Sequence, residues 1–169
     1  MAIRTILHYP DPRLRQKALP VERITPEIER LIDDMAETMY AAPGVGLAAT
    51  QIGEPHRIFI IDIAAEDEPS NLMVFVNPEI LSKVGEEVGA EGCLSFPGVS
   101  EEIKRATEVR VRAQGRDGKT FELTADGLLA VAIQHEHDHL DGVLMIDRVG
   151  MLKKRIIQRK MQKRADATS

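Results

Sequence analysis

Three residues in one short segment have the types and spacing needed to hold and use a metal ion. Residues 134 to 139 contain the pattern His-Glu-x-x-His, formed by His135, Glu136 and His139. Residues four positions apart lie on one face of an α-helix, so the two imidazoles can share an ion. The carboxylate next to them can then transfer protons as a general acid and base. An exposed, histidine-rich turn is the alternative, but the apolar run at residues 128 to 133 indicates burial.

A catalytic ion of this kind usually has three protein ligands and one open position, so a third ligand is needed. One protease class uses a histidine six residues after the second motif histidine, where this chain has Met145. Another uses a glutamate roughly twenty residues downstream, but residues 149 to 165 contain no carboxylate. Cys93 is the only thiol, and Gly92 beside it lets the backbone approach a crowded site. With the two histidines, Cys93 would complete a catalytic metal site.

A glycine-rich segment at Gly44–Gln51 raises a competing function, because it formally matches the G-x-G-x-x-A pattern of dinucleotide-binding proteins. That pattern normally follows a strand and opens a helix. Here the segment follows a predicted helix and leads through Gly53 towards a predicted strand, so a nucleotide role is disfavoured. A structural loop that uses small residues for close packing is the other reading.

Elements that could position these residues are visible in the apolar pattern. Thr25–Tyr40 predicts an amphipathic helix, with Thr25 as N-cap and proline at the first helical position. A second helix is expected from about Asp126 to Asp141, ending at Gly142, and a third from about Gly150 to Arg164. Strands are expected at Arg57–Asp62, Leu72–Asn77, Val109–Ala113 and Phe121–Leu123, the last two joined by a hairpin turn at Gly115–Lys119.

These elements predict an α+β fold: a single domain over residues 1–169, with mixed, mainly antiparallel strands around the central His-Glu-x-x-His helix, and further helices near both ends. Composition agrees, with 43% apolar and 29% charged residues. A net charge of -5 argues against nucleic acid as the main partner. One cysteine cannot form an internal disulfide, and neither a secretory leader nor a membrane span is evident, so a cytoplasmic location is expected.

Three segments, taken together and in order, resemble the signature motifs of the bacterial peptide deformylase family. They are G-V-G-L-A-A-T-Q at Gly44–Gln51, E-G-C-L-S at Glu91–Ser95 and Q-H-E-H-D-H-L-D-G at Gln134–Gly142, and the resemblance extends over nearly the whole chain. It implies removal of the formyl group from N-formylmethionyl nascent peptides. It also implies one divalent ion per chain, natively Fe(II), with Zn, Ni or Co accepted in its place.

The resemblance further implies roles for single residues. Cys93, His135 and His139 would bind the ion, and Glu136 would move the proton. The backbone N–H of Leu94 and the side-chain amide of Gln51 would stabilise the oxyanion, while the carbonyl of Gly46 would orient the substrate amide. Glu91 is expected to support this site, paired with Arg105.

A pocket for the methionine side chain is also expected. Leu128, Val131 and Ala132 precede His135 by seven, four and three residues, which places them on the ligand face, and Val45 should join them. Ordinary packing of the helix on the sheet is the alternative for Leu128. Some family members have a basic or aromatic residue shortly after the cysteine motif, whereas residues 96 to 100 contain no cation.

Two other functions stay open at this point. A zincin-like endopeptidase would need a third ligand downstream of the helix, and a structural metalloprotein or ribosome-associated binding module would need a closed four-ligand site. The basic stretch at residues 148 to 164 holds eight of the 22 basic residues and no acid. We expect Val149, Leu152 and Ile156 to pack its first part on the domain, leaving the residues after about Gln158 free to dock on ribosomal RNA. A solvated helix face is the simpler reading.

Overall fold

Alternate residues of one central strand face two different cores. The structure, a computed structural model, describes residues 2–168. In strand β2 (Ile58–Ile61), Phe59 and Ile61 pack in a cluster with the His-Glu-x-x-His helix α2 (Gly127–Leu140). Ile58 and Ile60 pack in a second cluster with helix α1 (Pro26–Ala41). The sheet is therefore covered by a helix on each face, which explains why all four residues of β2 are apolar and buried.

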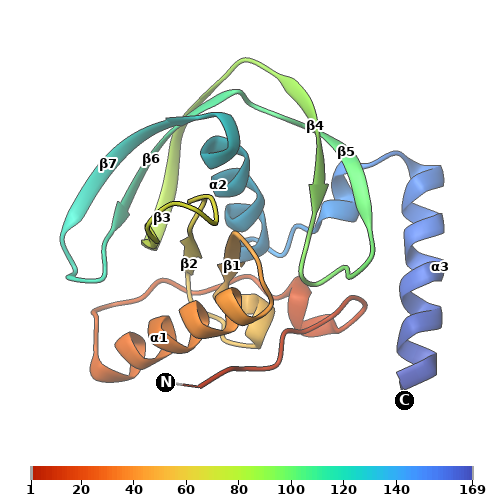
Figure 1. The fold of residues 1–169 in the computed structure, drawn as a ribbon, viewed down its shortest axis with the longest axis horizontal. Coiled ribbons are helices and arrows are strands. Elements are labelled where there is room, and N and C mark those ends of the chain that lie inside the picture. The colour runs from red at the N-terminus through yellow and green to blue at the C-terminus, as the bar shows by residue number, and fades with distance from the viewer. Residues whose placement is uncertain (1, 169) are drawn as a thin grey trace.

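Five antiparallel strands form the main sheet in the order β1-β2-β3-β6-β7. A separate antiparallel pair, β4 and β5, stands on the other side of α2 from β6 and β7, and Figure 1 shows α2 between them. The remaining strand bounds are β1 (Gly46–Ala48), β3 (Met73–Val84), β4 (Glu87–Gly92), β5 (Ser100–Arg105), β6 (Glu108–Gln114) and β7 (Thr120–Asp126). The predicted α+β class, with mainly antiparallel strands, is confirmed.

The predicted helices and hairpin are confirmed with small changes of bounds. The Thr25 side chain caps α1 by accepting from the N–H of Ile28, and Gly142 ends α2 with a φ of 73°. β6 and β7 pair across the predicted turn. Strands β1, β4 and β5 and three short 3-10 helices were not predicted from the sequence. The latter are η1 (Pro12–Arg15), η2 (Ala49–Ile52) and η3 (Met145–Arg148).

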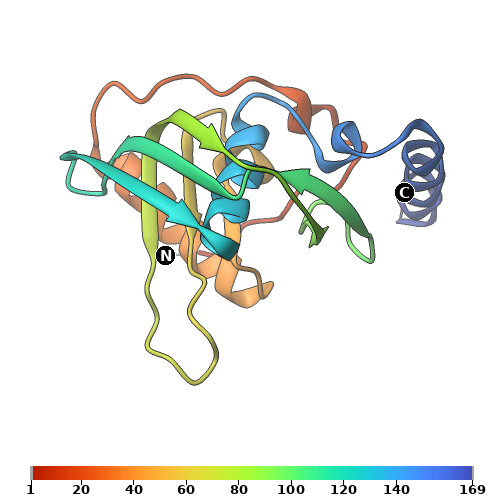
Figure 2. The same ribbon diagram turned by 90° about the horizontal axis from the view of Figure 1, so that it is seen from above.

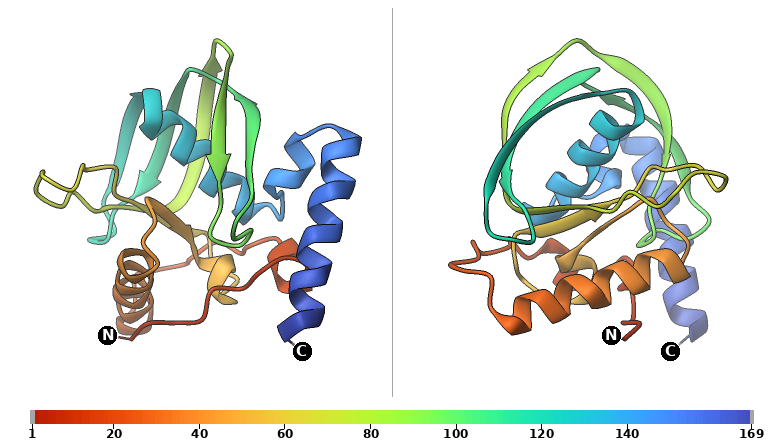
Figure 3. Two further views of the ribbon diagram at one scale, coloured as in Figure 1. Left: turned by 45° about the vertical axis from the view of Figure 1, so that its right-hand side comes forward. Right: turned by 60° about the vertical axis from the view of Figure 1, so that its left-hand side comes forward.

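The segment between β2 and β3 extends away from the body of the protein, as Figures 2 and 3 show. Its base is held by Asp62, which accepts hydrogen bonds from the Tyr40 hydroxyl and from the N–H groups of Ala64 and Asn71. No helix within residues 2–168 is long and apolar enough to cross a membrane.

Helix α3 (Met151–Thr168) packs on the domain through a different face from the expected one. Leu152 and Ile156 are 74% and 57% exposed, whereas Ile157 and Met161 are buried in a third core cluster with Phe96. The expectation for Leu152 and Ile156 was therefore wrong, and so was the expectation of a free distal half. The reason is that Ile157 and Met161 lie one turn apart, so burying both turns the earlier pair towards solvent.

Candidate metal centre and active site

One face of α2 supplies two of the three candidate ligands. His135 and His139 are buried, with ring centroids 5.1 Å apart. Cys93 follows the end of β4, and its Sγ lies 3.4 Å from Nε2 of His139. One ligand atom from each residue lies within 4.8 Å of the others. Ligand atoms around a tetrahedral ion with ordinary bond lengths are about 3.3–3.6 Å apart. The distance between Cys93 and His139 lies in that range, and the three residues together are close enough to be candidate ligands of one ion.

The surroundings of the two candidate histidine ligands decide which ring nitrogens could bind an ion. Nδ1 of His135 lies 3.0 Å from Oε1 of Glu91, so Nε2 is the ring nitrogen that could bind an ion. Burial lowers the pKa of His139, so its ring is neutral and has a lone pair to offer. The chemistry of this donor set, one thiol and two imidazoles, suits Zn(II) and Fe(II).

The expected pairing of Glu91 with Arg105 is present. Both guanidinium contacts are 2.9 Å, and Arg105 also donates to Asp138 at 2.7 Å. Burial acts to raise the pKa of Glu91, but hydrogen bonds from His135 and Arg105 outweigh it and lower the pKa to about 2. Glu91 is therefore a carboxylate at neutral pH, and it fixes the ring of His135 through a charge-assisted hydrogen bond.

Glu136 is a buried carboxyl group next to His135 in the sequence, and it lines a cavity together with Cys93 and His135. Burial raises its pKa to about 7. Its Oε1 has no hydrogen-bond partner within the described residues, although the atom is buried. A Cβ added to Gly46 would lie 2.6 Å from Oε2, so only glycine lets β1 approach this carboxylate. The arrangement leaves a buried carboxyl group with an unpartnered oxygen at the wall of an open space.

That space is a cavity of about 400 Å³. Its lining combines Cys93, His135 and Glu136 with the glycine-rich segment, including Val45 and Gly46, and with Gln51, Leu94 and residues 96 to 99. The cavity therefore brings together the residues assigned to metal binding and catalysis by resemblance, except His139, which lies beside Cys93 but outside the lining.

Gln51 is held in one orientation. Its Oε1 accepts from the N–H of Ala48 at 2.9 Å, which turns Nε2 the other way. Nε2 donates to Oγ of Ser95 at 3.0 Å and lies 3.6 Å from Sγ of Cys93. The side-chain amide therefore points at the candidate metal site.

The expected substrate pocket is divided in this structure. Val45 lines the first cavity, but Leu128 and Val131 line a second one of about 310 Å³, which also contacts Glu91. Ala132 lies in the core cluster that joins α2 to the sheet. The role of these residues in binding substrate stays a prediction.

Two residues near the site were not foreseen. Ser95 is fully buried and accepts from Gln51. Its place directly after Cys93-Leu94 was the only signal in the sequence. Lys160, on α3, donates to the carbonyl of Gly98 at 2.6 Å, so a cation does approach the segment that lacks one of its own. No sequence pattern links these two positions.

Two buried imidazoles and a partly buried thiol beside an unpartnered carboxyl oxygen, held between a helix and two antiparallel sheets, are typical of metal-dependent hydrolases. The comparisons with known proteins are more specific. The polypeptide deformylase family model matches residues 3–155. A peptide deformylase from Chromobacterium violaceum is 52% identical over 164 residues, which are 97% of each chain.

Solved structures agree. A peptide deformylase from Legionella pneumophila is 47% identical, with a TM-score of 0.92 over 99% of this chain and 98% of the other. One from Ehrlichia chaffeensis, in complex with actinonin, is 33% identical, with a TM-score of 0.92 over 97% and 98%. The chain therefore belongs to the polypeptide deformylase family and is an enzyme of that family, which acts on the formylated ends of nascent peptides.

Proposed function

We propose that this enzyme hydrolyses the formyl amide of N-formylmethionyl peptides with one divalent ion held by Cys93, His135 and His139. The observation that carries the proposal is the buried Glu136, whose Oε1 has no partner within the described residues and which lines one cavity with Cys93 and His135. A divalent ion in this position supplies Lewis acidity, which activates water and polarises the formyl carbonyl. The resemblance to the family favours Fe(II) as the native ion.

The proton steps belong to Glu136. Its raised pKa suits a group that must accept a proton from the attacking water and then deliver it to the departing amine. Because the backbone at Gly46 packs closely against one side of the Glu136 carboxylate, this carboxylate has little freedom to turn. One residue can therefore serve both halves of the reaction.

The developing oxyanion needs donors that are already in place. The oriented amide of Gln51 and the backbone N–H of Leu94 can supply two, each worth about 3 kcal/mol in comparable sites. The carbonyl of Gly46, on the edge strand β1, can accept from the substrate amide and align the scissile bond.

The substrate's first side chain is proposed to enter the cavity lined by Leu128 and Val131. This cavity adjoins the metal site through Glu91, which lines it and also contacts His135. The exposed apolar surface of Leu128 suits a methionine side chain. Val45 would contact the same residue from the first cavity, and Ala132 would support the wall from within the core.

The decisive experiment measures formate and free amine released from formyl-Met-Ala-Ser by protein loaded with Fe(II) under anaerobic conditions. Equal release of both products supports the proposal. Cleavage of an internal bond in an unformylated peptide would instead favour an endopeptidase, and absence of either product would contradict hydrolysis.

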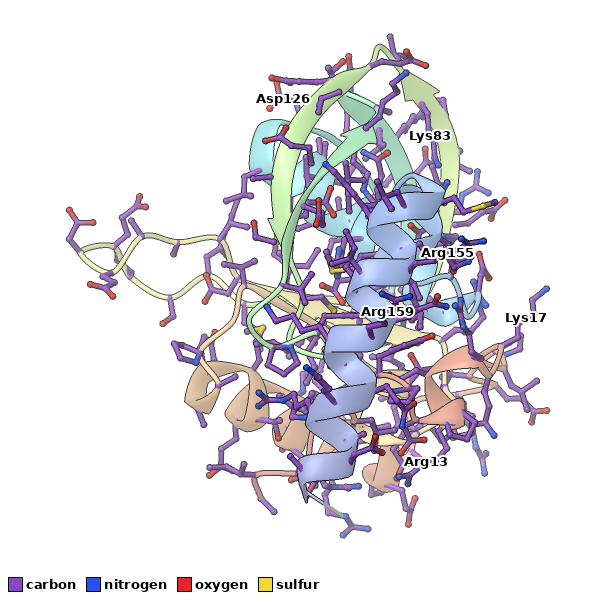
Figure 4. The ribbon with its side chains drawn as sticks, turned by 90° about the vertical axis from the view of Figure 1, so that its right-hand side faces the viewer. Arg13, Lys17, Lys83, Asp126, Arg155 and Arg159 are labelled. Carbon is purple, nitrogen blue, oxygen red and sulfur yellow. The ribbon has the colours of Figure 1, made fainter. Side chains whose placement is uncertain are left out.

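Docking of α3 on ribosomal RNA is a further part of the proposed function, with a cytoplasmic location as its consequence. Figure 4 shows Arg155 and Arg159 on the face of α3 that is turned away from the domain. Both are exposed, so they can contact phosphate without disturbing the buried side of the helix.

Truncation is unsuitable as a test, because removal of residues after Gln158 would also remove the buried Met161. The test is therefore ribosome sedimentation of the double variant Arg155→Glu/Arg159→Glu at low and physiological salt. The variant Arg23→Glu/Arg30→Glu, with the same change of charge elsewhere, is the control. Loss of association in the first variant alone supports docking, and equal association of both variants contradicts it.

A further inference from the structure

Strand β4 has a position without a side chain on the face that it turns towards α2. Side chains alternate along a strand, so Glu87, Gly89 and Glu91 share one face. The side chain of Glu91 reaches His135 on α2, which shows where that face points. Gly89 therefore faces α2, two residues before the carboxylate that supports the metal site.

The space in front of Gly89 belongs to the second cavity. Gly89 lies opposite Ile103 of β5, and both line the cavity with Leu128 and Val131. Leu128 is 56% exposed, so the β4–β5 wall of the cavity leaves much of its surface uncovered. The gap in this wall lies at Gly89, which has no side chain.

Nothing in the local backbone requires a glycine here. A Cβ built at Gly89 would meet no atom within 4 Å, and the φ of this residue lies outside the left-handed region. Gly46 is the opposite case, because a Cβ there would strike Glu136. The effect of glycine at position 89 is therefore to leave space.

The space exceeds what methionine needs. If each heavy atom occupies about the 30 Å³ of a water molecule, a methionine side chain takes about 120 Å³ and a phenylalanine side chain about 210 Å³. The cavity holds about 310 Å³. An isoleucine at position 89 would leave roughly 190 Å³, which suffices for methionine but not for phenylalanine.

We propose that Gly89 is a specificity-determining residue that widens the first-residue pocket, so that the enzyme accepts formylated N-terminal residues larger than methionine, aromatic ones included. This inference rests on the proposed function, and in particular on the second cavity as the pocket for the first side chain.

The test compares kcat/KM for formyl-Met-Ala-Ser and formyl-Phe-Ala-Ser in the wild type and in Gly89→Ala, Gly89→Val and Gly89→Ile. The ratio of methionine to phenylalanine should rise stepwise with side-chain size and reach about tenfold over the wild-type ratio in Gly89→Ile. KM for the methionine peptide should fall, because the new side chain covers its thioether.

Glu102→Ile is the matched control. Glu102 is exposed and alternates away from Ile103 on β5, so the same isoleucine enters the same two-stranded sheet on its outer face. Its methionine-to-phenylalanine ratio should equal that of the wild type. Metal content and circular dichroism identify any variant that has failed to fold, and the smaller Gly89→Ala then carries the comparison.

The outcomes separate the two proposals. If the wild type releases no formate from the methionine peptide, the proposed function fails and this inference fails with it. If the wild type is active but the selectivity ratio is the same in Gly89→Ile, the proposed function stands and the role of Gly89 is refuted. A ratio that rises equally in Glu102→Ile also refutes it.

Discussion

The closeness of Gly46 to Glu136 predicts that Gly46→Ala disables proton transfer while leaving the ion in place. A Cβ at position 46 would lie 2.6 Å from Oε2, whereas ordinary van der Waals contact begins at 3.4 Å. The carboxylate must therefore retreat by about 0.8 Å, since the backbone of β1 is held by its pairing with β2. A misplacement of about 1 Å in an active site can cost about a hundredfold in rate.

The assay is formate release from formyl-Met-Ala-Ser, with metal content measured on the same samples. We expect kcat of Gly46→Ala to fall about a hundredfold with one ion retained per chain. Gly150→Ala is the control, because a Cβ at Gly150 would meet no atom within 4 Å. It should behave as the wild type.

A double-variant comparison distinguishes displacement of Glu136 from a general disturbance of β1. In a Glu136→Gln background the residue that Gly46→Ala displaces no longer transfers protons, so the second substitution should add little. Full additivity of the two losses, or a near wild-type kcat for Gly46→Ala alone, would refute the reasoning.

Three further predictions concern the same site and the short helix η3 that follows α2 in the chain. Cys93→Ser should lose its ion on dialysis, because a serine hydroxyl stays protonated where a thiolate binds, and stoichiometric metal by elemental analysis would contradict this. Glu136→Gln should keep the ion but lose about 10²- to 10⁴-fold in kcat, and unchanged turnover would remove Glu136 from the mechanism. Asp147→Asn should destabilise the metal-free protein by about 1 kcal/mol at pH 7 in urea titrations. Burial acts to raise the pKa of Asp147, but the contacts with Arg15 and Lys154 contribute to a net lowering. The Asp147 carboxylate therefore stabilises the folded protein above its unfolded pKa near 3.8, and this stabilisation is lost as the pH falls through its folded pKa. An equal difference between Asp147→Asn and wild type at pH 7 and below pH 3 would show that charge is not the cause.

The sequence was most informative where local chemistry and local structure coincide. His135 and His139 are one helical turn apart, so their shared face followed from the helix alone. The strands with apolar runs were also predictable, because Ile58–Ile61 is buried on both faces. The hairpin between β6 and β7 was marked by its own turn residues.

The β4–β5 pair was missed because its sequence lacks the usual signal. β4 reads Glu-Val-Gly-Ala-Glu-Gly, and its one buried residue, Glu91, is held by ionic contacts with Arg105 on β5 rather than by apolar packing. Such a strand is decided by the contacts of its side chains with other elements, here those of Glu91 with Arg105 and His135, and a single sequence does not reveal them.

The face of α3 could not be predicted for a similar reason. The apolar residues near the start of α3 form more than one helix face that could pack on the domain. The face that is buried contacts Phe96, which lies more than fifty residues earlier in the chain. The division of the expected pocket into two cavities likewise depends on where β4 and β5 stand beside α2.

The three candidate ligands are attached to parts of the molecule that differ in how easily they open. His135 and His139 belong to a helix anchored in a large apolar core, whereas Cys93 follows a two-stranded sheet, and such a sheet is marginally stable alone. The pair also contributes Ile103 to the cluster around Phe96, but it lies outside the core that holds α2, so we expect its local opening to require less free energy than loss of α2. Dissociation of the ion should accordingly begin at the thiolate, at a rate set by fluctuation of that pair. The rate of amide hydrogen exchange in β4 and β5 should then match the rate at which the enzyme loses its ion, and both should exceed the rate of global unfolding.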